Sequence, residues 1–280
     1  MTQESMPPEW RRPDGVAPGT WRYLHQRSIA RHYDQFVADT PLCTLDRDFL
    51  LDHLRQQRGE TASQTKSETH SPLVLDLGCG TGRLAFPASE LGFEVVGVDL
   101  SQHMLEELAA RSEREPQACV VPVRASLVEL DCFADGIADH AFCMFSTLGM
   151  IAGEANRLRF LRHVHRILRD GGTFVFHVHR RWAALTEPGG AKQLLQSWLR
   201  SRRSPTDDFG DWTYAYRGLP DMFMHRFDTR ELRRLITASG LKLQRIDRIN
   251  LTGTATTHSP FQTGGYFLTT QKVSGTFLEE

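Results

Sequence analysis

The sequence predicts an α/β fold, namely a Rossmann-like, mostly parallel sheet of seven strands with helices on both faces. Two observations support this prediction. Short apolar segments alternate with helical segments from residue 72 onward, and a glycine-rich loop joins the first of these strands to the helix that follows it. Because the crossovers between parallel strands are right-handed, ligand sites in such folds lie at the carboxyl ends of the strands.

The alternation can be followed along residues 72–280, which we expect to form one domain. The expected strands are 73–77, 94–98, 120–124, 141–146, 172–179, 242–251 and 266–271. The expected helices are 84–91, 102–112, 156–169 and 229–239. In the helix at 156–169, Leu158, Leu161 and Val164 recur at helical spacing and form one apolar face, as in an amphipathic helix that packs on a sheet.

Four segments fall outside this alternation. Residues 1–19 are rich in Pro, Glu and Arg and predict a flexible tail. Residues 20–55 carry aromatic and apolar residues at helical spacing, with a proline break, and predict helices. Residues 56–71 contain one alanine and no larger apolar residue, which predicts a polar linker. In residues 180–228 the alternation stops, and three tryptophans and two tyrosines mark an insertion.

The charge and the cysteine content argue against several classes of function. The 33 Lys and Arg residues balance the 34 Asp and Glu residues to a net charge of −1, unlike a protein that coats nucleic acid or an anionic membrane. Five cysteines without a C-x-x-C pair argue against a disulfide framework and a structural zinc site. Neither a signal peptide nor a run of about 18 apolar residues is visible, so we expect a cytoplasmic protein without a membrane span.

The glycine-rich loop at residues 78–82 distinguishes two classes of nucleotide-type ligand. A dinucleotide-binding loop has the pattern G-x-G-x-x-G/A, and Arg83 occupies the position of its third small residue here. The Asp76 carboxylate beside the loop would repel a pyrophosphate, but it suits the ammonium group of S-adenosylmethionine, which carries no phosphate. Asp99, at the end of the second strand, can accept hydrogen bonds from both hydroxyls of a ribose. The pattern therefore favours S-adenosylmethionine over a nicotinamide dinucleotide.

Several segments resemble the motifs of class I S-adenosylmethionine-dependent methyltransferases. Residues 76–82, with the sequence DLGCGTG, resemble the first motif of that family, and Asp99 matches its ribose-binding acid. Residues 139–145 resemble the fourth strand, and residues 168–172 resemble the turn before the fifth. The resemblance is strong over residues 71–179 and weaker over the last helix and two strands. It implies an enzyme whose cofactor is S-adenosylmethionine.

The resemblance also implies roles for individual residues. Asp76 is expected to orient the ammonium group of the cofactor, directly or through water, and Asp99 to bind its ribose. Ser126 stands where the family often has an acidic residue for the adenine amino group, and its hydroxyl is a weaker substitute. The expected cofactor-binding residues are Asp76, Gly78, Cys79, Gly80, Asp99, Leu100, Ser126, Phe145 and Ser146.

The same resemblance implies functions for the flanking segments. Residues 31–34 resemble a Tyr-Asp segment that forms a lid over the cofactor, so we expect residues 20–55 to be a helical lid with Tyr33 as its aromatic residue. Residues 180–228 lie where many of these enzymes carry a substrate-binding insertion, so we expect a substrate cap there. The alternative interpretation of Tyr33 is the packing of an amphipathic helix, and that of the insertion is a small helical cap with a charged outer face.

Catalysis by such an enzyme requires few side chains. Methyl transfer from a sulfonium is an in-line displacement, for which the protein mainly supplies alignment and the exclusion of water. A general base is needed only if the accepting atom has a proton to lose. His177 and His179 share one face of a strand near its carboxyl end and, with Tyr33, are the candidate catalytic residues; they can equally be structural. No third ligand accompanies the two histidines at a suitable spacing, so no metal is expected.

We therefore expect a methyltransferase that acts on a small molecule, and two alternatives stay open. One is the same chemistry on tRNA or another RNA, for which tryptophans and arginines of the insertion could bind bases and phosphates. These residues are Trp182, Trp198, Trp212, Arg200, Arg202 and Arg203. The other is a non-catalytic module that binds S-adenosylmethionine, since no general base is evident. The sequence leaves the accepting atom and the oligomeric state open.

Overall fold

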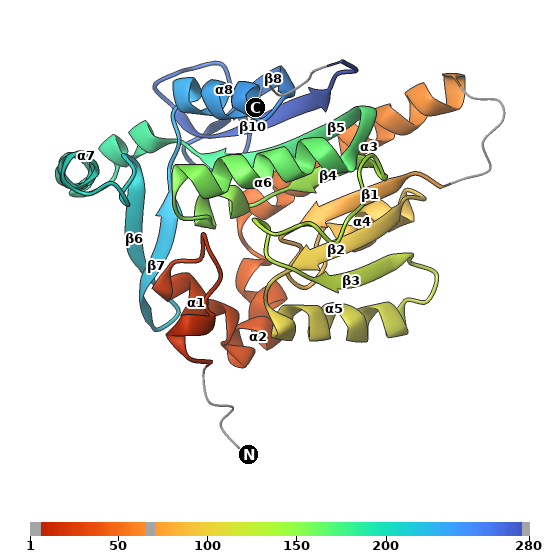
Figure 1. The fold of residues 1–280 in the computed structure, drawn as a ribbon, viewed down its shortest axis with the longest axis horizontal. Helices are drawn as coiled ribbons and strands as arrows, with labels where there is room; N and C mark the ends of the chain where they lie inside the picture. Colours follow the sequence, from red (N-terminus) through yellow and green to blue (C-terminus); the bar gives the residue numbers. More distant parts are fainter. Residues whose placement is uncertain (1–6, 65–70, 276–280) are drawn as a thin grey trace.

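Eight strands form one sheet in the computed structural model of the chain, which describes residues 7–64 and 71–275, with backbone only for 60–64 (Figure 1). In sheet order they are β3 (Val120–Arg124), β2 (Glu94–Asp99), β1 (Leu73–Leu77), β4 (Ala138–Cys143), β5 (Leu168–His179), β10 (Thr263–Lys272), β8 (Leu241–Asn250) and β9 (Thr256–Thr257). The first five are parallel, and β10 pairs antiparallel with both β5 and β8. The predicted fold class is confirmed. The sheet has one strand more than expected, because the two-residue β9 extends its edge.

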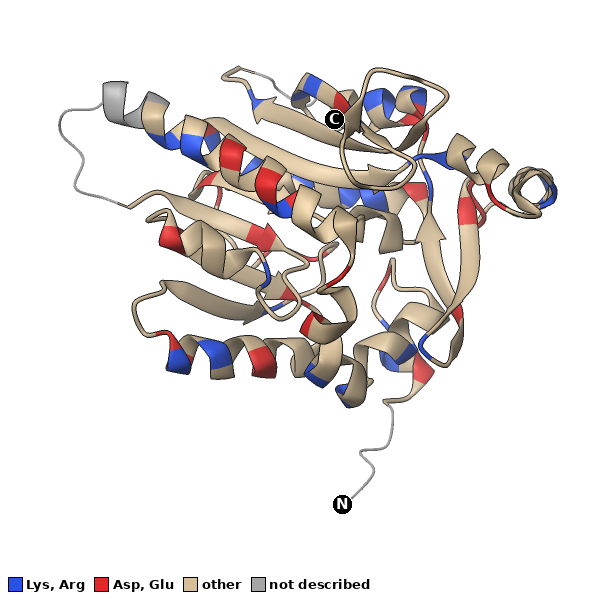
Figure 2. Ribbon diagram, turned by 180° about the vertical axis from the view of Figure 1, so that it is seen from behind, with Lys and Arg blue, Asp and Glu red and all other residues tan. Residues whose placement is uncertain are grey.

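Helices cover the two faces of the sheet and bury a separate apolar core on each (Figure 1). One face packs on α3 (Pro41–Gln64), α4 (Ala85–Glu90) and α5 (Gln102–Arg114), the other on α6 (Glu154–Ile167) and α8 (Thr229–Ala238). Alternate residues of each strand point to opposite faces, so Val74 of β1 joins the first core while Leu75 and Leu77 join the second. The outward sides of the helices carry charges of both signs (Figure 2). Among the described residues, no helix has the length and apolar character that crossing a membrane requires.

The N-terminal region is more ordered than the sequence predicts. Residues 1–6 of the expected tail lie outside the described residues, but residues 7–19 include a 3-10 turn, η1 (Glu9–Arg11), and the start of α1 (Pro18–Leu24). Val16 is buried and bridges to Ile151, and the Ala152 N–H donates to the Gly15 carbonyl at 2.8 Å. The prediction of a flexible tail is therefore wrong for residues 7–19, because its single valine is anchored in the core.

The prediction of a polar linker is wrong for residues 56–64. α3 continues to Gln64, so residues 56–64 are helical, and residues 65–70 lie outside the described part. Gln, Arg, Glu and Ala are good helix formers, and they extend a helix whose first half is held by the core. The segment 20–55 is helical as expected, with α1, α2 (Arg27–Val37) and the first half of α3.

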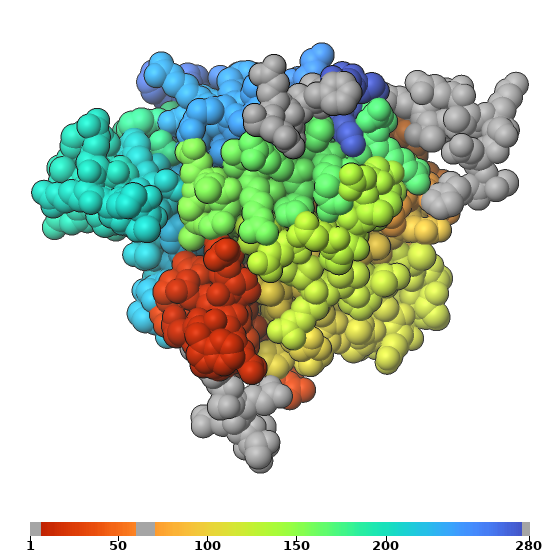
Figure 3. Space-filling model, viewed as in Figure 1, coloured from red at the N-terminus to blue at the C-terminus, as the bar shows by residue number. Residues whose placement is uncertain are grey.

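The insertion at residues 180–228 forms a 3-10 turn, a helix and a hairpin outside the main sheet. These are η3 (Arg181–Thr186), α7 (Gly190–Arg203), and β6 (Asp211–Tyr216) paired antiparallel with β7 (Leu219–His225). The N-terminal segment packs against the hairpin, and α7 projects from the side of the molecule (Figures 1 and 3). α1 approaches β7 so closely that a Cβ atom on Gly19 would lie 1.8 Å from the Asp221 carbonyl oxygen.

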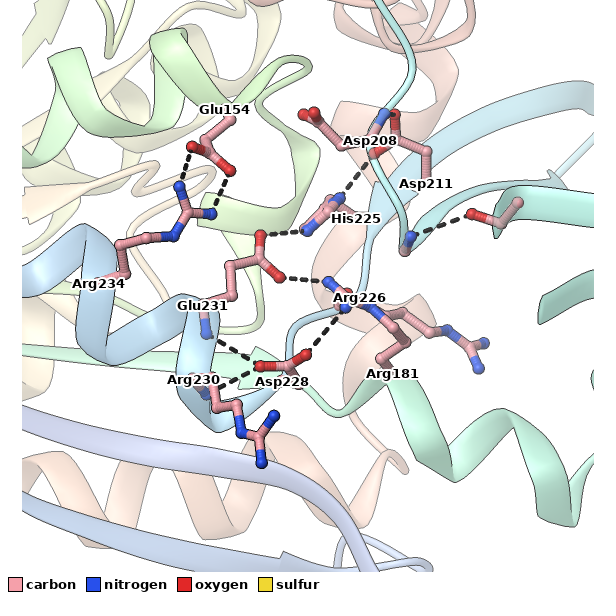
Figure 4. A network of polar contacts seen from close by, with 12 residues as sticks. Glu154, Arg181, Asp208, Asp211, His225, Arg226, Asp228, Arg230, Glu231 and Arg234 are labelled. Atoms are coloured by element: carbon pink, nitrogen blue, oxygen red, sulfur yellow. Dashed lines mark hydrogen bonds and ion pairs between the residues drawn. The ribbon is translucent and has the colours of Figure 1, made fainter. Parts of the chain in front are cut away.

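A buried polar network joins the base of this hairpin to α8 (Figure 4). The His225 ring lies 2.6 Å from Asp211 through Nδ1 and 2.7 Å from Glu231 through Nε2. Arg181 donates to Glu231 and, at 3.0 Å, to Asp228, so cations balance the acids. Burial opposes ionisation of Glu231, but the hydrogen bond with His225 and the nearby arginines lower its pKa. The network thus fixes the hairpin relative to the sheet.

Candidate functional site

A cavity of about 570 Å³ lies at the carboxyl ends of the parallel strands, between the sheet, the N-terminal helices and the hairpin. Most of the residues that the sequence predicts for the site line this cavity. They are Tyr33, Asp76, Gly78, Cys79, Gly80, Asp99, Leu100, Ser126, Phe145 and His179. Two predicted residues, Ser146 and His177, are buried behind the cavity wall instead.

The glycine loop between β1 and α4 is held against the end of β2. The N–H groups of Gly78 and Cys79 both donate to the Val98 carbonyl, at 2.8 and 3.0 Å. Gly78 has a φ of +86°, and a Cβ atom there would lie 2.4 Å from Thr147 Cγ2, so only glycine fits. Gly78 and Gly80 of the loop therefore expose their backbone atoms directly to the cavity.

Asp99 at the end of β2 is fixed by backbone donors. Its Oδ2 accepts a hydrogen bond from the Gly80 N–H at 2.9 Å, and its Oδ1 accepts one from the Ser101 N–H at 2.8 Å. Burial raises the pKa of the carboxyl group, and the two backbone hydrogen bonds act in the opposite direction. Each carboxylate oxygen can accept a further hydrogen bond, so Asp99 presents an oriented acceptor pair to the cavity.

Asp76 is the least satisfied acid of the site. Asp76 is only 3% exposed, and its Oδ2 has no hydrogen-bond partner among the described residues. Burial raises the pKa of this carboxyl to about 8; Arg83 lowers it and Asp99 raises it further. Buried polar atoms are normally partnered, so an unpartnered oxygen at a cavity surface indicates a ligand that supplies the donor. The ammonium group of S-adenosylmethionine fits this requirement.

A strained turn follows β4 and borders the same cavity. Phe145 and Ser146 have φ values of 55° and 62°, a region that non-glycine residues adopt rarely and at a cost of about 1–3 kcal/mol each. Buried Asp46, from α3, accepts a hydrogen bond from the Phe145 N–H at 3.0 Å. The Ser146 hydroxyl accepts one from the His179 N–H at 3.2 Å and donates to Met224 Sδ at 3.6 Å. Ser146 thus supports the cavity wall rather than forming it.

The two histidines of β5 lie in different surroundings. Their rings are 5.2 Å apart on one face of the strand, as predicted, but only His179 reaches the cavity. Along the backbone of the strand, His177 lies two residues, or about 6.6 Å, before His179. It is 1% exposed, and its Nδ1 lies 3.4 Å from Asp46 Oδ1. Burial lowers the pKa of His179 to about 3, with smaller contributions from His177 and Arg226, so its imidazole is neutral at physiological pH.

The N-terminal helices cover the end of the cavity next to the glycine loop. Tyr33 of α2 lies over Gly80, with its ring 3.8 Å from the position of a Cβ atom there. Thr81 donates to Asp34 at 2.6 Å, and the Ser101 hydroxyl donates to the Leu24 carbonyl at 2.7 Å. Burial raises the pKa of the Tyr33 phenol well above its usual value, so it stays protonated and does not act as a base.

Sequence reasoning missed Asp46 and the wall that faces the glycine loop. That opposite wall comes from the hairpin and consists of three aromatic and two methionine side chains: Trp212, Tyr214, Tyr216, Met222 and Met224. The aromatic content of the insertion was the available signal, although it did not identify which residues face inward. Asp46 had no signal, because it lies in a helix 99 residues before its partner Phe145.

The middle of the chain matches a family of known proteins. Residues 74–172 match the family model described as a methyltransferase domain. A protein of Geobacillus sp. (strain WCH70), provisionally named a methyltransferase, is 28% identical over 152 residues, which are 54% of this chain and 56% of that protein. The chain therefore spans about half the length of the curated relative that it matches.

Solved structures share the fold over a longer range. A methyltransferase from Methanosarcina mazei is 17% identical with a TM-score of 0.60, over 74% of this chain and 94% of that one. The 1,6-didemethyltoxoflavin-N1-methyltransferase of Burkholderia thailandensis, solved with 1,6-didemethyltoxoflavin and S-adenosylhomocysteine, is 19% identical with a TM-score of 0.57, over 94% and 93%. Residues 74–172 thus match a methyltransferase domain, and the chain shares the fold of solved S-adenosylmethionine-dependent methyltransferases, in agreement with the resemblance of its motifs.

Proposed function

We propose that this chain transfers the methyl group of S-adenosylmethionine to a small-molecule acceptor by in-line displacement. The observation that carries the proposal is the buried Asp76 carboxyl beside Asp99, whose Oδ2 has no hydrogen-bond partner in the described part of the chain, at one end of a cavity whose other end is apolar. The first end suits a cation that carries a ribose, and the second suits an organic acceptor. The Burkholderia structure, which shares the fold over nearly its whole length, contains a small organic molecule beside S-adenosylhomocysteine.

In this proposal the loops after β1, β2 and β3 hold the cofactor. Asp76 binds its ammonium group, and Asp99 accepts hydrogen bonds from the ribose hydroxyls. The backbone of residues 78–80 passes under the methionine part, and Leu100 and Ser126 border the adenine. Tyr33 covers the loop from the opposite side, as a lid does.

The reaction needs alignment more than it needs acid–base chemistry. Bound S-adenosylmethionine supplies an electrophilic methyl group and a neutral thioether as leaving group. The strained turn at Phe145, fixed by Asp46, places a rigid wall where the two ends of the cavity meet. The cofactor and the acceptor, bound together in the cavity, would exclude water from the line of displacement. The neutral imidazole of His179 can accept a hydrogen bond from the attacking group of the acceptor.

Charge favours a small molecule over RNA as the acceptor. The two arginines that line the cavity are both paired: Arg226 donates to Glu187 at 2.7 Å, and Arg83 lies 3.7 Å from Asp46. Neither is free to hold a phosphate group. Of the insertion's tryptophans, Trp182 and Trp198 point outward and do not line the cavity, so only Trp212 belongs to it.

The test is a transfer assay with methyl-labelled S-adenosylmethionine, using a metabolite extract and bulk tRNA as separate acceptor pools. We expect label in the metabolite pool, and its loss in the Asp99→Ala variant. Label in tRNA alone would favour the RNA alternative. Tight cofactor binding without transfer to either pool would favour a non-catalytic module.

A further inference from the structure

We propose that the acceptor is an uncharged, planar aromatic or heteroaromatic compound that stacks on the hairpin β6–β7. This inference rests on the proposed function, because it assigns the part of the cavity that the cofactor leaves free. It follows from three features of that part: the side-chain pattern of the hairpin, the distribution of methionines, and the pairing of charges.

The cavity face of the hairpin is built from alternating aromatic and thioether side chains. Trp212, Tyr214 and Tyr216 point into the cavity, while the intervening residues 213 and 215 are exposed, as the period of a strand requires. In the register of the hairpin, Trp212 pairs with Met224 and Tyr214 with Met222. Cross-strand neighbours of this kind contact each other on one face, so the five side chains make one continuous wall. Flat π-systems stack on such a wall with favourable offset or edge contacts.

Methionine is concentrated around this cavity. The chain has seven methionines, and all five within the described residues line the cavity; they are Met104, Met144, Met150, Met222 and Met224. The methionine side chain is unbranched and polarizable, contacts aromatic rings favourably, and adapts to different shapes. A wall with this composition selects for an apolar, flat ligand without imposing one outline, so we expect several related ring systems to bind.

The charged groups around the cavity select against an anionic acceptor. Four carboxyl groups and two guanidinium groups line it, and both guanidinium groups are engaged by carboxylates outside the cofactor end. Arg226 also lies over the Trp212 ring, 4.3 Å from its centroid, which holds the cation against the wall. The remaining excess of acid favours the cationic cofactor and repels a second ligand that is negatively charged.

His179 lines the cavity and provides a polar group for the proposed acceptor site. During transfer the carbon–sulfur bond breaks with its electron pair on sulfur, and a bond forms between the methyl carbon and the oxygen or nitrogen of the acceptor. If that atom carries a proton, the neutral ring of His179 accepts a hydrogen bond from it, and the proton leaves to water as the methyl group is transferred. A neutral imidazole at the cavity surface offers one ring nitrogen as an acceptor for this hydrogen bond.

The test is calorimetric titration of protein saturated with S-adenosylhomocysteine, using 2-naphthol, 2-naphthoate and the saturated alcohol 2-decalol as probes. We expect 2-naphthol to bind at least about tenfold more tightly than the anion or the saturated ring. Equal or tighter binding of either of those two would overturn the inference. Failure of S-adenosylhomocysteine itself to bind would instead contradict the proposed function.

Variants locate the binding site of the probe. Trp212→Ala should weaken 2-naphthol binding about tenfold and leave the affinity for S-adenosylhomocysteine within about twofold. The matched control is Trp198→Ala, in the same insertion but 40% exposed and outside the cavity, which should change neither affinity. If the Trp212→Ala variant no longer binds S-adenosylhomocysteine, the same two affinities are measured for the Tyr214→Leu variant instead. Unchanged 2-naphthol affinity in the variant that retains S-adenosylhomocysteine would overturn the assignment.

Discussion

The two ends of the cavity are built in opposite ways. At the cofactor end, the buried acids Asp76 and Asp99 lie at the carboxyl ends of β1 and β2, and Asp76 is only partly satisfied by hydrogen bonds within the described residues. At the acceptor end, aromatic and thioether side chains come from a hairpin more than 100 residues later in the chain, and Arg226 there is paired with Glu187. In the proposed function, this difference means that one end recognises a fixed ligand by specific charges, whereas the other binds flat apolar ligands of differing outline.

The two ends also differ in their effect on stability. A buried, unpartnered carboxyl group and a turn with positive φ values destabilise the protein without ligand, and a bound cofactor would offset part of this. The hairpin wall buries apolar surface and stabilises the fold in the ordinary way. Substitutions at the cofactor end should therefore separate binding from stability, whereas those at the acceptor end should change both in the same direction.

The largest effect is expected at Asp99. Its two oxygens are already oriented by backbone donors, so the hydroxyls of a ribose would bind to a fixed pair of acceptors. Asp99→Ala should reduce the affinity for S-adenosylmethionine by about 100-fold, from the loss of two hydrogen bonds to a charged group. The measurement is calorimetry, and retained affinity would falsify the ribose assignment.

Asp76→Asn should weaken cofactor binding less than Asp99→Ala does. It should also stabilise the protein without ligand. We expect about a tenfold loss of affinity, because the amide carries no charge for the ammonium group. The folded-state pKa of Asp76 is about 8, above its ordinary value of 3.8, so wild-type stability is greatest below that ordinary value and falls as the pH rises toward 8. The asparagine of the variant does not ionise, so the variant lacks this loss of stability with rising pH.

Thermal unfolding of the two proteins from pH 5 to pH 8 measures this difference. The melting temperature of Asp76→Asn should exceed that of the wild type by an amount that grows with pH, to at least about 2 °C at pH 8. The wild-type affinity for S-adenosylhomocysteine should rise from pH 6 to pH 7.5, because the ligand binds the ionised carboxyl. A constant difference in melting temperature, or an affinity that falls over this range, would contradict the account of Asp76.

Asp46→Ala should slow transfer while leaving cofactor binding nearly intact. The substitution removes the acceptor for the Phe145 N–H and loosens the strained turn, so kcat should fall about tenfold through lost alignment. The affinity for S-adenosylhomocysteine should stay within about threefold. Asp48→Ala is the control, since Asp48 lies on the same helix with its side chain 57% exposed. A loss confined to cofactor affinity would show that Asp46 does not position the turn.

The sequence predicted the cofactor end better than the acceptor end, for physical reasons. β1 and β3 have the predicted bounds; β1 is specified locally by a buried run of leucine and valine between Pro72 and Gly78. Motif residues such as Asp76 and Asp99 are close in sequence to the strands that position them. The hairpin wall and Asp46 depend on contacts between distant segments, which no local pattern encodes.

The smallest effect is expected for Tyr33→Ala, which probes the lid. The ring lies over the glycine loop, so its loss should weaken cofactor binding by about threefold to tenfold through lost packing, without unfolding the sheet. His32→Ala, an exposed neighbour on the same helix, is the control. Affinity and turnover equal to those of the wild type would show that Tyr33 only packs α2 in place.

We propose that the buried acids of the cavity select S-adenosylmethionine over dinucleotides. Calorimetric titration of the wild-type protein with S-adenosylmethionine and, separately, with NAD tests it most directly. We predict one molecule of S-adenosylmethionine bound per chain and no measurable binding of NAD, because Asp76 and Arg83 disfavour the dinucleotide at the glycine loop. Binding of NAD, or no binding of S-adenosylmethionine, would contradict the account.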